Sequence, residues 1–202
     1  MLTVYLVRHA QTEWNAQGIV QGWKDSPLTK DGAEKAELLG RHLKEIPLDA
    51  VYASPTERAV KTAEIVSGLP AASIRKNEGL MELNYGSWDG RRAADIQKEE
   101  EAKVTTFFTE PHLFEAPGGD TFAALQKRAA TAWESIVDTH NEGRILLVSH
   151  SGTLKCLLAY LKQESLEYFW EAPSLANCSL THVEIENGKI VVKDEGNVSH
   201  FE

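Results

Sequence analysis

The chain has 202 residues, of which 42% are hydrophobic and 25% are charged, a balance typical of a globular protein with a sizeable buried core. Its formal net charge of −9 argues against a broad nucleic-acid-binding surface, which needs clustered lysine and arginine side chains. An anionic ligand would have to be attracted by a local group of cations. No apolar run approaches the length of a membrane span. We therefore predict neither a nucleic-acid nor a membrane partner.

The amino-terminal segment and the two cysteines predict a cytoplasmic protein. Met1 leads directly into a predicted strand, without the basic region and apolar run of a signal peptide. Cys156 and Cys178 have neither metal-binding nor redox-type spacing and lie among apolar residues. We expect both cysteines to be reduced core residues.

The first half of the chain alternates between predicted strands and helices. Residues 2–7 are rich in β-forming side chains and predict a buried strand, which is followed by a long polar loop over residues 10–28. Apolar residues at helical spacing then predict a helix capped by Thr29. A short buried strand at 50–53 precedes a second amphipathic helix, for which Ser54 is the predicted cap.

The second half continues this alternation and ends in a hairpin. Residues 73–76 predict an exposed strand, and residues 92–108 predict a charged helix. Thr121 is the predicted cap of another long helix, and the apolar run 145–148 is typical of a central parallel strand. Near the carboxyl end, Asn187-Gly188 lies between two β-rich segments, a strong indication of a hairpin at or near a sheet edge.

These elements predict an α/β fold. We expect three layers: a doubly wound, mostly parallel sheet with one antiparallel edge strand, covered by helices on both faces. Residues 1–202 are predicted to form a single domain. The region around 85–120 is the hardest to assign, and we interpret it as a helical, lid-like insertion.

Four polar side chains follow predicted strands at their carboxyl ends. Arg8 and His9 end the first strand, Arg58 lies in the first helical turn after the second, and His150 follows the strand at 145–148. Open α/β sheets bind ligands at this edge. Two guanidinium groups match the oxygens of a phosphate, and histidines can act as nucleophiles or proton carriers. The pattern predicts a phosphate site.

Further motifs, in matching order along the whole chain, make the sequence similar to the histidine phosphatase superfamily, also called phosphoglycerate-mutase-like. The segments that carry this resemblance are Leu6–Asn15, Gln21-Gly22, Asp25–Thr29, Ser54-Pro55, Arg58-Ala59, Leu80–Glu82, Gly86–Gly90, Pro117–Gly119 and Val148–His150. The segment Gly86–Gly90 and the tail Glu195–His200 resemble the small bacterial, broad-specificity phosphatase branch.

The resemblance implies a metal-independent reaction that passes through a phosphohistidine. His9 would be the nucleophile, with one ring nitrogen fixed by a hydrogen bond and the other free. Glu82 would protonate the leaving alkoxide and then activate water. A protonated His150 would help to offset phosphoryl charge. The expected phosphate-binding residues are Arg8, Asn15, Arg58, His150 and Ser151, and no cofactor or metal site is expected.

The sequence departs from the family pattern at two places. Ala10-Gln11 stands where Gly-Glu is usual, and Ser151 replaces the glycine that usually follows the second histidine. These changes concern pocket shape, because they remove no proposed catalytic group. We also expect Gln21, Gly22 and Tyr85 to contribute to the pocket.

Three functions are weighed at this point. We favour a phosphomonoester hydrolase that acts on small phosphorylated metabolites and releases inorganic phosphate. A cofactor-dependent phosphoglycerate mutase is the second hypothesis. It is less favoured because the mutase branch usually carries a longer insertion rich in basic residues, whereas the segment Ile96–His112 is short and acidic. A non-catalytic phosphate-binding regulator is the third. The physiological substrate and the oligomeric state are left open.

Overall fold

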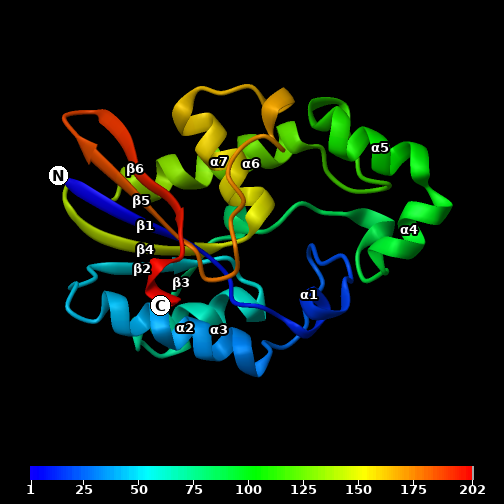
Figure 1. Ribbon diagram of the computed structural model, residues 1–202. Coiled ribbons are helices and arrows are strands. Elements are labelled where there is room, and N and C mark those ends of the chain that lie inside the picture. Colours follow the sequence, from blue (N-terminus) through cyan, green and yellow to red (C-terminus); the bar gives the residue numbers. More distant parts are fainter. Residues whose placement is uncertain (202) are drawn as a thin grey trace.

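A six-stranded sheet forms the centre of the computed structural model, which describes residues 1–201 (Figure 1). The strands lie in the order β3-β2-β4-β1-β5-β6. Their bounds are β1 Leu2–Arg8, β2 Ala50–Ala53, β3 Arg75–Lys76, β4 Gly143–Ser149, β5 Leu180–Glu186 and β6 Lys189–Asn197. The first four are mutually parallel, whereas β5 runs antiparallel to β1 and pairs with the edge strand β6. The predicted mostly parallel sheet with an antiparallel edge is confirmed.

Helices cover both faces of the sheet, as predicted. The helices of the chain are α1 Glu13–Gln17, α2 Lys30–Leu43, α3 Glu57–Ser67, α4 Ala93–Glu99, α5 Glu101–Thr109, α6 Phe122–Val137 and α7 Ser151–Lys162, of which α2, α3, α6 and α7 cover the sheet. Helices α2 and α3 lie below the sheet in Figure 1, and α6 and α7 lie above it. Within residues 1–201, no helix combines the length and apolar character needed to cross a bilayer.

Side-chain alternation along the central strands divides the core into two layers. Along β1, Val4 and Leu6 pack in the cluster that contains α6 and α7 side chains, while Tyr5 and Val7 pack in the cluster with α2 and α3. A strand directs successive side chains to opposite faces, so a sheet covered twice needs apolar residues at every position. Cys178 lies in the second of these layers; it and Cys156 are buried and unpaired, as predicted.

The helix starts were predicted with mixed success. Thr29 and Thr121 cap α2 and α6 through their hydroxyl groups, as expected from sequence. Ser54 is not the cap of α3: Thr56 occupies that position and makes no side-chain capping hydrogen bond. The reason is that the Ser54 hydroxyl lies 2.7 Å from Nε2 of His150 instead.

Two irregular regions hold structure that the sequence pattern did not resolve. The loop predicted at 10–28 contains the short helix α1, which Thr12 and Asn15 close with a reciprocal capping box. The helix predicted at 92–108 is divided into α4 and α5 at Glu100, where the backbone leaves the helical region. Arg91 pairs with the carboxylates of both Glu99 and Glu100 at this break. The sequence has no glycine or proline there from which the break could be predicted.

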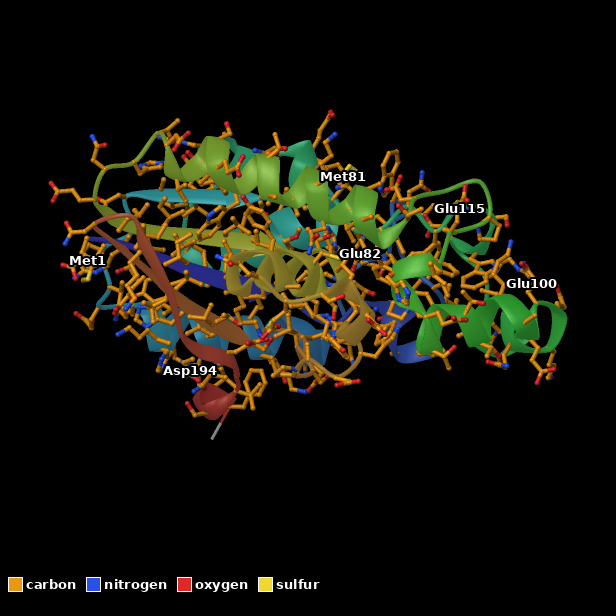
Figure 2. The ribbon with its side chains drawn as sticks, turned by 90° about the horizontal axis from the view of Figure 1, so that it is seen from above. Met1, Met81, Glu82, Glu100, Glu115 and Asp194 are labelled. Carbon is orange, nitrogen blue, oxygen red and sulfur yellow. The ribbon has the colours of Figure 1, made fainter. Side chains whose placement is uncertain are left out.

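A third hydrophobic cluster joins α4 and α5 to the rest of the molecule. It combines Ile96 and Phe107 from these helices with Trp88, with Phe122 of α6 and with Cys156 of α7. Figure 2 shows Glu100 at the outer end of this region and Glu82 near the middle of the molecule, at its inner end. The region 85–120 therefore extends one wall of the molecule away from the sheet.

The predicted hairpin joins β5 and β6. Asn187 and Gly188 have φ angles of 52° and 75°, the left-handed values that a two-residue hairpin turn requires. Glycine adopts this conformation without a steric penalty, and asparagine tolerates it better than most residues. The turn sequence thus fixes the register with which β6 completes the sheet.

Candidate active site

The register of the parallel strands brings the predicted phosphate-binding residues together. Arg8 of β1 lies opposite Ser149 of β4, and Ala53 of β2 lies opposite Val148. The residues that follow these strands, His9, Ser54 and His150, consequently emerge side by side at one edge of the sheet. The rings of the two histidines lie 5.2 Å apart, centroid to centroid.

His9 lies at the cavity wall with one ring nitrogen held by the backbone. Its Nδ1 is 2.8 Å from the carbonyl oxygen of Ala10, and a carbonyl only accepts hydrogen bonds, so Nδ1 carries the proton. Burial, Arg58 and Arg8 hold the pKa of His9 well below its usual value. The ring is therefore neutral near pH 7, and its Nε2 lone pair is free.

Arg58 is fixed behind His9 by groups that only accept hydrogen bonds. Its side chain is completely buried. Nη1 donates to the carbonyl of Lys24 and to the Asp25 carboxylate, both at 2.9 Å, and Nη2 donates to the carbonyl of Gly22 at 2.6 Å. Nη2 also lies 3.1 Å from Nδ1 of His150. These contacts lock the direction of the guanidinium plane before any ligand arrives.

His150 is neutral in this arrangement, so the expectation of a protonated His150 is wrong. An arginine only donates, which makes Nδ1 of His150 the acceptor and leaves the proton on Nε2, facing the Ser54 hydroxyl. Burial, followed by the nearby charge of Arg58, holds the pKa of His150 well below its usual value. His150 does not line the cavity; it lies behind it, against Arg58.

These two buried histidines predict a loss of stability as the pH falls. The unfolded chain takes up protons near its ordinary histidine pKa of about 6.5, whereas the folded chain does not, so the free energy of unfolding decreases below that pH. Between pH 7.5 and 5.5 we expect each histidine to contribute about 1 kcal/mol to this decrease. Urea unfolding of His150→Gln at both pH values should show a decrease smaller by that amount. An unchanged pH dependence would contradict the neutral assignment.

Arg8 and Arg58 both retain unused donors. Nη1 of Arg8 donates to the carbonyl of Leu175 at 2.6 Å. Within the described residues 1–201, the buried Nε atoms of Arg8 and Arg58 have no hydrogen-bond partner. A buried donor without a partner is costly, and an oxyanion placed between the strand ends would supply acceptors. The site is thus electrostatically prepared for a phosphate-like group.

Glu82 occupies the amino-terminal end of α7. Its Oε2 accepts from the backbone N–H of Gly152 at 3.0 Å, and its Oε1 accepts from those of Thr153 and Leu83 at 3.1 and 2.9 Å. A side chain at position 152 would meet the carboxylate, since a Cβ there would lie 2.5 Å from Oε1. Helix amino termini favour negative charge, which explains how a carboxylate is held in a buried position.

A cavity of about 350 Å³ opens in front of these groups. Seven of the predicted residues line it: Arg8, His9, Asn15, Gln21, Glu82, Tyr85 and Ser151. Asn15 accepts a hydrogen bond from the Thr12 N–H through Oδ1, which leaves its amide nitrogen as a donor. Gln21, by contrast, is engaged with the hydroxyl groups of Thr12 and Ser26. The prediction of Gly22 as a pocket residue is wrong, because it contributes through its carbonyl to Arg58.

The two departures from the family pattern next to His9 have structural roles. Ala10 donates its N–H to the Thr62 hydroxyl and has no positive φ angle, so glycine is not required there. Gln11 accepts hydrogen bonds from Thr29 through its backbone and side-chain oxygens. Neither side chain lines the cavity. Ala10 is therefore tied to α3, and Gln11 supports the start of α2.

Two functional candidates were missed by sequence reasoning. The buried carboxylate of Asp89 accepts the N–H groups of Gly22, Trp23 and Lys24, and so shapes the loop whose carbonyls hold Arg58. Its place inside the Gly86–Gly90 motif was the available signal. Lys155 lines the cavity as a buried cation, and the signal was a single lysine within the otherwise apolar run Leu154–Leu158.

Comparison with known families decides the relationship. Residues 4–197 match the model of the histidine phosphatase superfamily (branch 1). The chain belongs to this superfamily. Its membership confirms the relationship predicted from the Arg8-His9, Arg58, Glu82 and His150 segments, all of which lie within the matched range.

Relatives of this superfamily member carry both phosphatase and mutase names. The putative phosphoserine phosphatase 2 of Hydrogenobacter thermophilus is 31% identical over 189 residues, which cover 94% of this chain and 92% of the relative. The probable phosphoglycerate mutase GpmB of Salmonella choleraesuis is 31% identical and covers 100% of this chain and 96% of its own. Among solved structures, Bacillus stearothermophilus YhfR is similar with a TM-score of 0.95, 39% identity and full coverage of both chains.

Proposed function

We propose that this histidine phosphatase hydrolyses phosphomonoesters of small metabolites through a phosphohistidine on His9. The observation that carries the proposal is the state of His9: it is neutral, its Nδ1–H is held by a backbone carbonyl, and its Nε2 is free near the buried Arg58 and the half-buried Arg8. A nitrogen lone pair oriented in this way can attack phosphorus without prior deprotonation.

The proposed reaction has two steps, and the second step restores the His9 nitrogen and the Glu82 carboxyl group that the first step changed. Nε2 of His9 forms a bond to phosphorus as the ester P–O bond breaks, and Glu82, which enters this step in its protonated form, gives its proton to the leaving oxygen and becomes a carboxylate. In the second step Glu82 takes a proton from water, whose oxygen attacks phosphorus and breaks the P–N bond. Inorganic phosphate leaves, and both side chains return to their starting states.

The residues around His9 supply the charge that the transferring phosphoryl group needs. Arg8 is proposed to neutralise its oxygens from the cavity wall, where Asn15 and Ser151 donate hydrogen bonds. Arg58 does not line the cavity, and it is proposed to add positive charge from behind the wall, with its Nε as the donor that has no partner within residues 1–201. His150 is proposed to orient Arg58, and it can reach the phosphoryl group only if Arg58 or Ser54 releases a ring nitrogen. The α4–α5 region is proposed to act as a cover over the leaving group.

The relatives and the outer cavity both support the proposed substrate class. Relatives are named for phosphoserine and phosphoglycerate chemistry, which supports a small phosphorylated substrate. The outer wall adds aromatic side chains, among them Phe107, Phe108 and Trp170, and so supports leaving groups with an apolar part. A cytoplasmic location stays a prediction of the sequence.

The decisive experiment combines a substrate panel with capture of the intermediate. Wild-type protein is assayed with alkyl and aryl phosphates in the presence of EDTA, and the reaction with labelled substrate is quenched in base and in acid. We expect metal-free phosphate release and a covalent label that survives base but is lost in acid, as a phosphoramidate bond requires. A base-labile label, or activity abolished by EDTA, would overturn the proposed mechanism.

Phosphoglycerate mutase activity is the second candidate, because a relative of equal identity carries that name. A mutase must hold a second phosphate while the phosphohistidine returns its group, whereas the outer cavity here offers aromatic side chains and one lysine, Lys155. We therefore expect hydrolysis to exceed isomerisation when phosphoglycerate and bisphosphoglycerate are supplied together. Isomerisation faster than phosphate release would reverse this choice.

A further inference from the structure

Lys155 is unusual among the lysines of this chain because it is buried, with a relative exposure of 7%. No other lysine in residues 1–201 is buried. It lies on α7 four residues after Ser151, and residues at this spacing share one face of a helix. Both side chains line the cavity in front of His9. The helix rises about 6 Å over four residues, so Lys155 lies one turn beyond the phosphate-binding end.

The ammonium group of Lys155 is only partly satisfied by the protein. Nζ donates to the carbonyl of Phe169 at 3.1 Å and lies 5.0 and 5.3 Å from the ring centroids of Phe169 and Trp170. An ammonium group has three N–H donors, so two are left for other acceptors. The ammonium group thus lies at the aromatic wall of the cavity and has two N–H donors available for a ligand.

No carboxylate neutralises this cation within the part of the chain that the structure describes. The ion pairs of residues 1–201 do not include Lys155, and Glu195, which attracts it from a distance, is bonded to Lys162 at 3.0 Å. Glu82, the carboxylate in the cavity, is occupied by backbone N–H groups. Burial lowers the pKa of Lys155 accordingly. A partly buried, unpaired cation is costly, and an apolar residue would fill the position at lower cost.

We propose that Lys155 is a specificity-determining residue that binds a carboxylate on the leaving group of the phosphomonoester. This inference rests on the proposed phosphatase function. One lysine in an apolar surrounding balances a single negative charge, whereas the double charge of a second phosphate would remain half uncompensated. The preferred substrate therefore carries its carboxylate beyond an apolar or aromatic portion that packs against Phe169 and Trp170.

The test compares two matched pairs of aryl phosphates. The para and meta isomers of carboxyphenyl phosphate are each paired with the corresponding methyl ester, which is larger by one methyl group and carries no charge on that substituent. Wild-type kcat/KM should favour the carboxylate over the ester in at least one pair. In Lys155→Gln this ratio should fall about tenfold or more, mainly through KM, while the ester is hydrolysed within about threefold of the wild-type rate.

Two further variants separate recognition from a structural role. Glutamine can still donate to the Phe169 carbonyl but carries no charge, whereas Lys155→Met removes both features and Lys155→Arg retains the charge. We expect glutamine and methionine to lose the carboxylate preference alike and arginine to keep most of it. If glutamine preserves the preference, or if methionine lowers both substrates equally, Lys155 only anchors Phe169 and the inference is wrong. Absence of activity on every ester in the wild-type protein would instead refute the phosphatase function.

Discussion

Replacement of His9 by alanine is expected to lower kcat for every phosphomonoester by at least about a thousandfold. The reason is that His150 cannot replace His9 as the nucleophile, because both of its ring nitrogens are engaged with Arg58 and Ser54 and it does not line the cavity. The covalent label found in the wild-type protein should be absent. Phosphate release by the purified variant and acid–base quenching of labelled substrate measure both effects.

Two matched variants show whether such a loss belongs to the chemistry of His9. His9→Asn has an amide that can still donate to the Ala10 carbonyl, but it offers no nucleophilic nitrogen, so we expect the same loss with phosphate binding retained. His112→Ala changes an exposed histidine in the region between α5 and α6 and should leave activity unchanged. Residual activity above about a tenth of wild type in both His9 variants would show that another group attacks phosphorus.

The arrangement of the site was predictable from sequence to the extent that strand ends define it. Arg8 directly follows an apolar run, His9 and His150 come one residue after the end of such runs, and parallel strands place their carboxyl ends at one edge of a sheet. Thr29 and Thr121 were predictable as caps because a threonine caps a helix through contacts three residues away. These features depend on local pattern, which a single sequence contains.

The remaining features depend on contacts between distant segments. The neutral state of His150 follows from its burial and from Arg58, which lies 92 residues earlier, and the orientation of Arg58 follows from carbonyls at Gly22 and Lys24. The burial of Lys155 depends on the placement of Phe169 and Trp170 beside α7. The spacing of residues along the chain gives no information about such contacts. Residue types therefore indicated which side chains form the site, but they did not indicate the protonation states or hydrogen-bond partners of those side chains.

Replacement of Glu82 by glutamine is expected to separate the two steps of the reaction. An alkyl alkoxide needs a proton to leave, so the first step should slow by about 10²–10⁴-fold with alkyl phosphates. Nitrophenolate leaves without a proton, so with nitrophenyl phosphate the rate of the first step should remain within about tenfold of the wild-type rate. The second step also needs Glu82, as base, and should then limit turnover. Stopped-flow measurement should therefore show a nitrophenol burst of one equivalent followed by slow release.

The same variant has a structural cost that must be measured alongside. The Glu82 carboxylate accepts N–H groups from Leu83, Gly152 and Thr153, and an amide would turn its own NH₂ toward some of these donors, at a cost of about 1–3 kcal/mol. A lower Tm is therefore expected, and only the leaving-group dependence reports on proton transfer. Glu78→Gln, at an exposed position on the same segment, should change neither quantity. If Glu82→Gln slows the nitrophenol burst and the hydrolysis of the alkyl phosphate by the same factor, Glu82 positions α7 and another group supplies the proton.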